Sequence, residues 1–140
     1  MIGSILAGKG RLISVAPDTP VYEILALLHR HRIGAVPVMD GAQLVGLVSE
    51  RDIVRCLHSH GKAILDEAAV DIMTSPVVTA HPRIGVCEAM AIMTDRRFRH
   101  LPVVDDSGDV LGLVSIGDLV KRRIEDAEAE AESLKLYIAS

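Results

Sequence analysis

Apolar residues recur along this chain at the spacing of a helical face in some segments and as short continuous runs in others. The first helical face begins after Thr19-Pro20, because threonine caps helices and proline suits the first helical position. Gly34 predicts the end of this helix. The apolar residues of the face follow at the spacing i, i+3, i+4, i+7, namely Val21, Ile24, Leu25 and Leu28.

Short apolar runs on both sides of this helix predict strands. A tight turn is expected at Asp40-Gly41, and a second helix is expected to begin at Ser49. The predicted order is therefore strand, helix, strand, strand, helix. The three strands cover residues 12–15, 36–39 and 44–48.

The same order is expected a second time, because the sequence nearly repeats itself. Segment 35–40 returns 65 positions later as 100–105, and segment 46–54 returns 66 positions later as 112–120. A duplication predicts two copies of one unit packed on each other, so that a feature of one copy is expected in both. The second copy predicts strands at 77–79, 101–104 and 110–114, and helices at 86–97 and from Ser115.

Two prolines, Pro37 and Pro102, fall inside predicted strands at equivalent places in the two copies. Proline cannot donate a backbone hydrogen bond, so each is expected at a strand start or on a sheet edge. Residues 58–76 connect the copies, with a short helix expected near 67–73.

A final helix is expected from about Asp118 to Ile138. Its apolar residues are spaced alternately by four and three, which is a heptad seam. Two interpretations remain open, a helix folded back on its own domain and a contact with a second subunit. The seam residues are Val120, Ile124, Ala127, Ala131, Leu134 and Ile138.

Composition narrows the class of protein. The chain has 140 residues, of which 49% are apolar, so it can bury one sizeable aliphatic core. Its aromatic residues are only Tyr22, Phe98 and Tyr137, which weighs against a protein that stacks single-stranded bases. No run reaches the ~18 apolar residues of a membrane span. Cys56 and Cys87 form no CxxC pair, so a cytoplasmic protein with reduced thiols is expected.

The net charge of −4 is concentrated at the end of the chain. From Ile124 onward there are five acidic residues and one basic residue, and the remainder is neutral. No broad basic surface is expected, so nucleic acid is not an expected partner.

The segments Ser49–Asp52 and Ser115–Asp118 share the pattern S-x-x-D at a helix start. One interpretation is purely structural, because serine followed by an acid three residues later is a helix cap. The other is a ligand site. A carboxylate accepts hydrogen bonds from a ribose diol, and free backbone N–H groups at a helix start meet a phosphate. The two roles are compatible.

These repeats resemble a tandem of CBS domains, the Bateman module. The resemblance covers residues ~10–123, and its specific mark is G-L-V-S-x-x-D after a P-V-x-D hairpin in both halves. It implies an α/β (α+β) fold of two repeats packed with pseudo-twofold symmetry, plus an extended C-terminal helix. The expected division is 1–66 for the first repeat, 67–123 for the second, and 124–140 for the acidic helix.

The resemblance also implies clefts that bind adenosine-containing ligands, such as AMP, ADP, ATP, NAD(H) or S-adenosylmethionine. Carried over residue by residue, it assigns the aspartate to ribose and the serine to phosphate in each repeat. The second-repeat site is expected to comprise Thr79, Arg99, His100, Leu101, Pro102, Ser115 and Asp118. The first-repeat site is expected to comprise Ser14, Ala35, Val36, Pro37, Ser49, Arg51 and Asp52.

The two sites are expected to be unequal. Arg99-His100 in the second repeat corresponds to Gly34-Ala35 in the first, so a smaller charge complement is expected at the first site. The six histidines and two cysteines show no zinc spacing, and no metal site is expected. No nucleophile elbow, catalytic triad or P-loop is recognisable, so neither an enzyme nor a catalytic cofactor is expected.

The leading hypothesis is a cytoplasmic regulatory module for energy sensing. It binds an adenine nucleotide or dinucleotide and signals to an unknown protein effector by conformational change. The resemblance implies further association as a homodimer, and no membrane partner is expected. The alternative is a ligand-free interaction scaffold that acts through dimerisation and the acidic helix.

Overall fold

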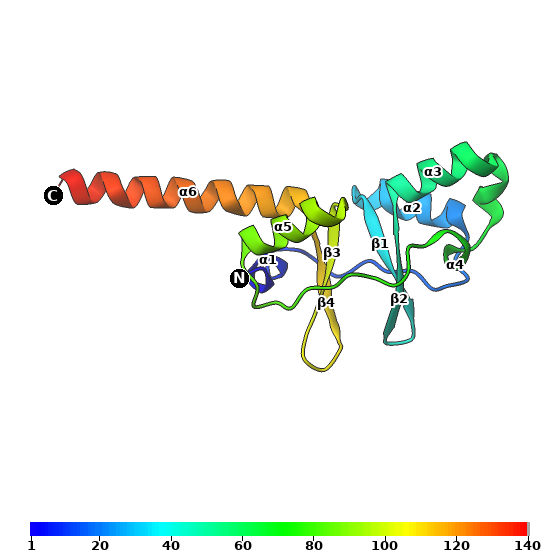
Figure 1. The fold of residues 1–140 in the computed structure, drawn as a ribbon. Helices are drawn as coiled ribbons and strands as arrows, with labels where there is room; N and C mark the ends of the chain where they lie inside the picture. Colours follow the sequence, from blue (N-terminus) through cyan, green and yellow to red (C-terminus); the bar gives the residue numbers. More distant parts are fainter. Residues whose placement is uncertain (140) are drawn as a thin grey trace.

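The computed structural model describes residues 1–139, and Ser140, the last residue of the predicted acidic segment, lies outside them. Two β-hairpins stand side by side, with helices packed above each, and one long helix projects from the body (Figure 1). The helices are α1 (Gly3–Leu6), α2 (Val21–His31), α3 (Glu50–His60), α4 (Ala69–Ile72), α5 (Val86–Arg96) and α6 (Ile116–Ala139), with a 3-10 turn η1 (Lys62–Asp66). The strands are β1 (Ala35–Asp40), β2 (Gln43–Ser49), β3 (His100–Val104) and β4 (Val110–Ser115).

The predicted hairpins are confirmed in both copies. β1 pairs antiparallel with β2 around a turn where Gly41 has a φ of 63°. β3 pairs antiparallel with β4, and Gly108 in the longer second turn has a φ of 85°. The register is the same in the two copies, because Pro37 faces Leu47 and Pro102 faces Leu113.

The strand predicted at 12–15 is reduced to a single parallel bridge at Val15, and the strand predicted at 77–79 is replaced by a single bridge one residue later, at Ala80. The N–H of Val15 donates to the carbonyl of Pro37, and the carbonyl of Val15 accepts the N–H of Met39. The next bond of this parallel ladder, toward the start of the chain, would need an N–H on Pro37. Proline has none, and pairing stops there. Pro102 ends the pairing of Ala80 in the same way. The residues before Val15 and Ala80 therefore leave the sheet.

The predicted end of the first long helix at Gly34 is wrong by three residues. α2 ends at His31, and Arg32 adopts the left-handed conformation with a φ of 53°. Ile33 then donates its N–H to the carbonyl of Leu28, which closes the helix end. Arg97, at the equivalent place after α5, repeats this with a φ of 59°. The predicted cap is also different, because Thr19 Oγ1 accepts the N–H of Ala16 and leaves Pro20 at the helix start.

The two hydrophobic cores are built crosswise, which means that each contains side chains from the segment that leads into the other repeat. Ile5 of α1 and Ile2, the residue just before α1, are buried in the core of the second repeat. Ala69 and Ile72 of α4, at the start of the second repeat, are buried in the core of the first. Each repeat is thus completed by the segment that leads into the other, which ties the copies into one folding unit.

No helix among residues 1–139 combines the length and the apolar character that crossing a bilayer requires.

The crosswise packing predicts that α1 stabilises the whole chain. Replacing Ile2, which is fully buried, with alanine should lower the free energy of unfolding by about 2–4 kcal/mol, because it leaves a cavity in the second core. Urea denaturation measures this. Val54→Ala, on an exposed face, is the control and should cost about 0.5 kcal/mol or less. Equal effects of the two substitutions would contradict the packing.

Candidate functional site

The S-x-x-D segments start helices α3 and α6, directly after strands β2 and β4. Both capping interactions are present. Asp52 Oδ2 accepts the N–H of Ser49 at 2.8 Å, and Asp118 Oδ2 accepts that of Ser115 at 2.8 Å. The serine hydroxyls in turn accept the N–H groups of Asp52 and Asp118, at 3.2 and 3.1 Å. The structural interpretation of the motif is therefore correct, and the carboxylate oxygens left over decide whether a ligand is also possible.

The Asp52 and Asp118 carboxylates differ in the hydrogen bonds that they accept from the protein and in their exposure. Asp52 Oδ1 accepts hydrogen bonds from Arg55 Nη2 at 2.6 Å and from Thr74 Oγ1 at 3.2 Å, and only 8% of this side chain is exposed. Both bonds of the Asp118 side chain fall on Oδ2, where Lys9 Nζ is the second donor, and 26% of this side chain is exposed. Asp118 is the more accessible carboxylate.

Lys9 and Thr74 lie 65 positions apart, which is the offset of the early repeat segments, so they are equivalent residues. Each reaches the motif aspartate of the other repeat. The leading segment of one repeat therefore lies across the helix start of the other, as the crosswise cores require. The residues that follow, Leu12-Ile13 and Val77-Val78, are those that the prolines keep out of the sheets.

Two clefts result. The Asp118 cleft has a volume of about 910 Å³ and is walled by Leu12, Ile13, Leu111 and Leu113. The Asp52 cleft has a volume of about 320 Å³ and includes Val77, Val78 and Phe98. In both, a helix start and its carboxylate from one repeat face apolar backbone segments from the other. A 910 Å³ cleft is large enough for a nucleotide-sized ligand.

The structure regroups the predicted site residues. Ser49, Arg51 and Asp52 share their cleft with Arg99, and Ser115 and Asp118 share theirs with Ala35. Each cleft therefore combines residues of both repeats, because the leading segment of each copy lies at the helix start of the other. The predicted residues that line neither cleft are Ser14, Val36, Pro37, Thr79, Leu101 and Pro102. Of these, Val36, Pro37, Leu101 and Pro102 are buried in the two sheets.

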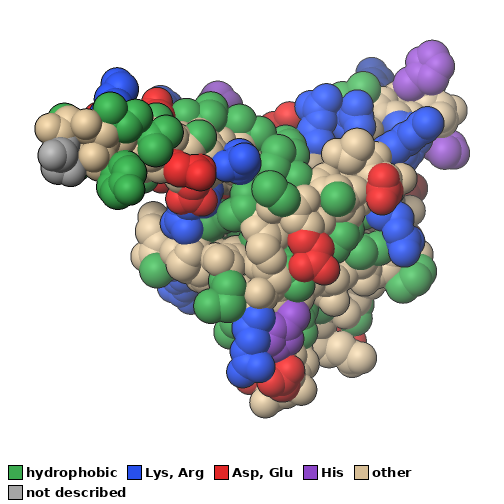
Figure 2. Space-filling view, turned by 60° about the vertical axis from the view of Figure 1, so that its left-hand side comes forward, with side chains coloured by type: hydrophobic (Ala, Val, Ile, Leu, Met, Phe, Trp, Pro, Cys, Tyr) green, Lys and Arg blue, Asp and Glu red, His purple; other side chains and the backbone are tan. Residues whose placement is uncertain are grey.

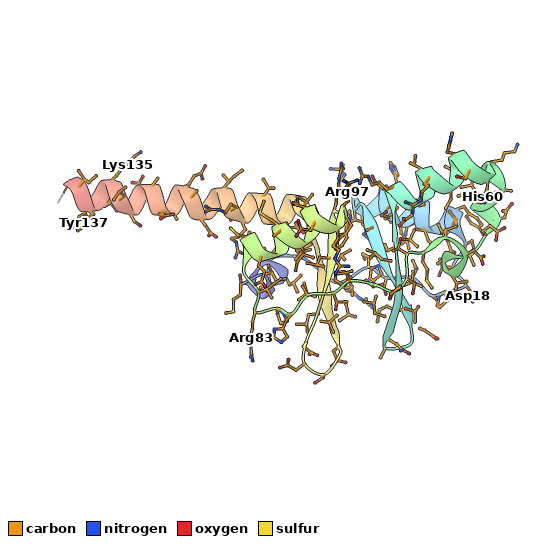
Figure 3. The ribbon with its side chains drawn as sticks, viewed as in Figure 1. Asp18, His60, Arg83, Arg97, Lys135 and Tyr137 are labelled. Carbon is orange, nitrogen blue, oxygen red and sulfur yellow. The ribbon has the colours of Figure 1, made fainter. Side chains whose placement is uncertain are left out.

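The expected charge difference is reversed as well. The Asp52 cleft is lined by five arginines and two carboxylates, and the Asp118 cleft by three cations and one carboxylate. The cause is the basic run 96–99 at the end of α5, which reaches the Asp52 cleft and not the Asp118 cleft. Arg97 accordingly lies at the junction between the two repeats (Figure 3).

Both clefts also contain polar residues that were not among the predicted site residues, including Lys9, Arg11, Arg32, Arg55 and Thr74. Lys9 and Thr74 could have been recognised as equivalent residues, since they are separated by the same 65 positions as the repeated segments. The others had no local pattern that distinguishes them from solvated surface.

Partial burial alone would raise the pKa of Asp118. The hydrogen bond and charge of Lys9, with the N–H of Ser115, outweigh it and hold this pKa below its ordinary value. The carboxylate is therefore ionised at neutral pH. Its stabilising contribution is fully present above the ordinary aspartate pKa and is lost as the pH falls through the lowered one.

His100 forms the wall between the two clefts and lines both. Its ring packs on Gly34, where an added Cβ would lie 3.0 Å from ring atoms Cε1 and Nε2. Burial of the ring, reinforced by the charge of Lys9, lowers the pKa of His100 against the opposing pull of Glu50 and Asp118. The imidazole is therefore neutral at pH 7 in the absence of a ligand.

The lowered pKa of His100 predicts a pH-dependent loss of stability. As the pH falls from 7.5 to 5.5 the unfolded chain binds this proton more readily than the folded one, so folding weakens. The free energy of unfolding should fall less steeply in His100→Gln than in the wild type, as measured by urea denaturation at each pH. His29→Gln, on the exposed face of α2, should keep the wild-type slope. An unchanged slope in His100→Gln would refute this.

Comparison with known proteins identifies the family of this fold. The family model described as "CBS domain" matches residues 8–59 and 69–125. The mitochondrial CBS domain-containing protein CBSX3 of Arabidopsis thaliana is 37% identical, over 98% of this chain and 71% of its own length. An inosine-5′-monophosphate dehydrogenase of Methanocaldococcus jannaschii is 32% identical, over 92% of this chain but only 25% of the enzyme.

Solved structures match in the same way. A putative signal-transduction protein with CBS domains from Burkholderia ambifaria superposes with a TM-score of 0.83 at 37% identity, over 89% of this chain and 94% of its own. A CBS domain protein of Pyrobaculum aerophilum in complex with AMP has a TM-score of 0.74 at 28% identity, over 84% and 88% of the two chains. The CBS domain pair of protein MJ0100, in complex with 5′-methylthioadenosine and S-adenosyl-L-methionine, has a TM-score of 0.79 at 26% identity, over 90% and 97%.

The expected fold class is confirmed, as two strand-and-helix repeats with a long C-terminal helix. The chain belongs to the CBS-domain family and carries two copies of that domain in tandem.

Proposed function

We propose that this chain is a regulatory module that binds an adenosine-containing ligand, first in the Asp118 cleft and second in the Asp52 cleft. The observation that carries the proposal is the Asp118 carboxylate. It is ionised and partly exposed, and it lies in a cleft of nucleotide size with both of its protein bonds on Oδ2.

The contents of the Asp118 cleft suit the three parts of a nucleotide. A carboxylate accepts the hydrogen bonds of a ribose diol. Lys9, Arg11 and Arg32 supply cations for a phosphate. Leu12, Ile13 and the backbone beside them offer an apolar slot for adenine.

The relatives support the ligand class. AMP, 5′-methylthioadenosine and S-adenosyl-L-methionine, which are bound by the matching structures, have only adenine and the ribose ring with its 2′,3′-diol in common. Recognition of the ribose and adenine by Asp118 and the apolar slot accounts for that shared part. The cations favour ligands with phosphate, namely AMP, ADP, ATP or NAD(H), over uncharged nucleosides.

The Asp52 cleft is the weaker ribose site in this proposal. A ribose there must displace Arg55 or Thr74 from Oδ1, whereas at Asp118 it competes with Lys9 alone. Its five arginines nevertheless favour an anion. We therefore expect unequal occupancy of the two clefts, with the larger and more accessible one filled first.

Signalling follows from the crosswise architecture. A ligand in the Asp118 cleft lies between residues 9–13 and 31–35 of one repeat and Ser115 and Asp118 of the other. It therefore favours the arrangement of the repeats that suits both contacts, and a protein effector that reads this arrangement responds to the adenylate pool.

The first test is stabilisation by ligand. A ligand at ~100 times its dissociation constant raises the unfolding free energy by about 2.7 kcal/mol, so thermal unfolding with AMP, ADP, ATP, NAD, NADH and S-adenosylmethionine should identify at least one that shifts the midpoint by several degrees. Asp118→Asn should abolish most of this shift. Asp126→Asn, on the exposed side of α6, is the matched control and should retain it. No shift with any of the six compounds would reject the proposal.

The second test concerns Lys9. In the ligand-free protein its ammonium group is held by Asp118, and on binding we expect it to turn to the phosphate. Lys9→Met should therefore weaken binding of AMP roughly tenfold but leave adenosine binding unchanged or tighter, because adenosine has no phosphate and no longer competes with the amine. Isothermal titration of both ligands measures the ratio. Equal losses for AMP and adenosine would show that Lys9 has a different role.

A further inference from the structure

Helix α6 continues well beyond the body, and every residue from 123 to 139 is exposed. The heptad seam lies open along it. The exposed fractions of Val120, Ile124, Leu134 and Ile138 are 40%, 53%, 58% and 75%. Leu119, one residue or about 100° around the helix from Val120, is instead fully buried against the body. Figure 2 shows hydrophobic side chains along this projecting arm.

The seam by itself fits a second copy in either direction. With Val120 at heptad position d, the seam residues alternate between d and a, and large residues stand at both ends with Ala127 and Ala131 between them. A parallel partner places each residue against its own copy. An antiparallel partner places Ala127 against the partner's Ala131, so small again meets small.

The charges that flank the seam distinguish the two directions. Position e holds Lys121, Glu128 and Lys135, and position g holds Arg123 and Glu130. Figure 3 shows Lys135 and Tyr137, at positions e and g, on opposite sides of α6, as flanking positions require. The remaining acids, Glu125, Asp126 and Glu132, fall at positions b and c, away from a partner helix.

In a parallel pair, position g of one helix faces position e of the next heptad of the other. Arg123 then meets the partner's Glu128, and Glu130 meets the partner's Lys135, and symmetry makes each pair twice. In an antiparallel pair, Lys121 meets the partner's Lys135, and Glu128 and Glu130 meet their own copies. All flanking pairs attract in the first arrangement, and all of these repel in the second.

We propose that α6 pairs with α6 of a second copy as a parallel two-stranded coiled coil, with the seam from Val120 to Ile138 as its core. This interface goes beyond ligand binding and does not depend on it. The two alanine layers bury little area but permit close approach of the helices. The parallel direction brings both bodies to the same end of the coil, where the clefts of two modules lie near one another.

Cysteine trapping tests the direction. In a Cys56→Ser/Cys87→Ser background, Ala131→Cys should form a symmetric disulfide on mild oxidation, since core positions of a parallel pair lie within disulfide reach of their own copies. Ala129→Cys, at the outward position f, is the matched control and should not. If instead the heterodisulfide between Ala127→Cys and Ala131→Cys chains predominates, or trapping does not exceed that of the control, the proposal is wrong.

Charge reversal tests the ion pairs. Glu130→Lys places like charges at the two Glu130–Lys135 contacts and should weaken the dimer roughly tenfold in sedimentation equilibrium of the full chain at low salt. Glu132→Lys makes the same charge change at outward position b and should leave the dimer unchanged. Glu130→Lys/Lys135→Glu restores the attraction and should recover wild-type association. Equal effects of Glu130→Lys and Glu132→Lys, failure of the double variant, or a monomeric wild type would each overturn the proposal.

Discussion

The contact of each leading segment with the aspartate of the opposite repeat is the interaction on which this structure depends. Lys9 reaches Asp118 and Thr74 reaches Asp52, and the same crossing carries α1 and α4 into the opposite cores. This crossing of the leading segments has two consequences. The repeats fold as one unit, and each cleft is formed by both repeats. A ligand in either cleft therefore acts on the interface between the copies, which is what a sensor requires.

Much of the fold could be predicted from the sequence, because local chemistry determines it. The Asp40-Gly41 turn, the caps at Ser49 and Ser115 and the apolar periods of the helices act over a few residues, and the structure confirms them. Because the sequence is duplicated, each element predicted in one copy was also predicted in the other. The prolines were expected at a strand start or on a sheet edge, and each lies third in its strand. The strands that they shorten were predicted too long, since the effect depends on which neighbour each proline faces.

The composition of the clefts could not be predicted to the same degree. The motif residues Ser115 and Asp118 were found because they carry their own local signal. Their neighbours come from the other repeat, and a sequence of two similar halves does not show whether a segment packs on its own copy or on the other. This ambiguity explains why Arg99 was grouped with Asp118, whereas it lines the Asp52 cleft.

The most direct test of this account is a crystal structure of the protein grown with the ligand that gives the largest thermal shift. The account predicts the ribose hydroxyls on the Asp118 carboxylate, adenine against Leu12-Ile13, and Lys9 released from Asp118 toward the phosphate. A ligand bound elsewhere, with the Lys9–Asp118 pair intact and the cleft open to water, would contradict it.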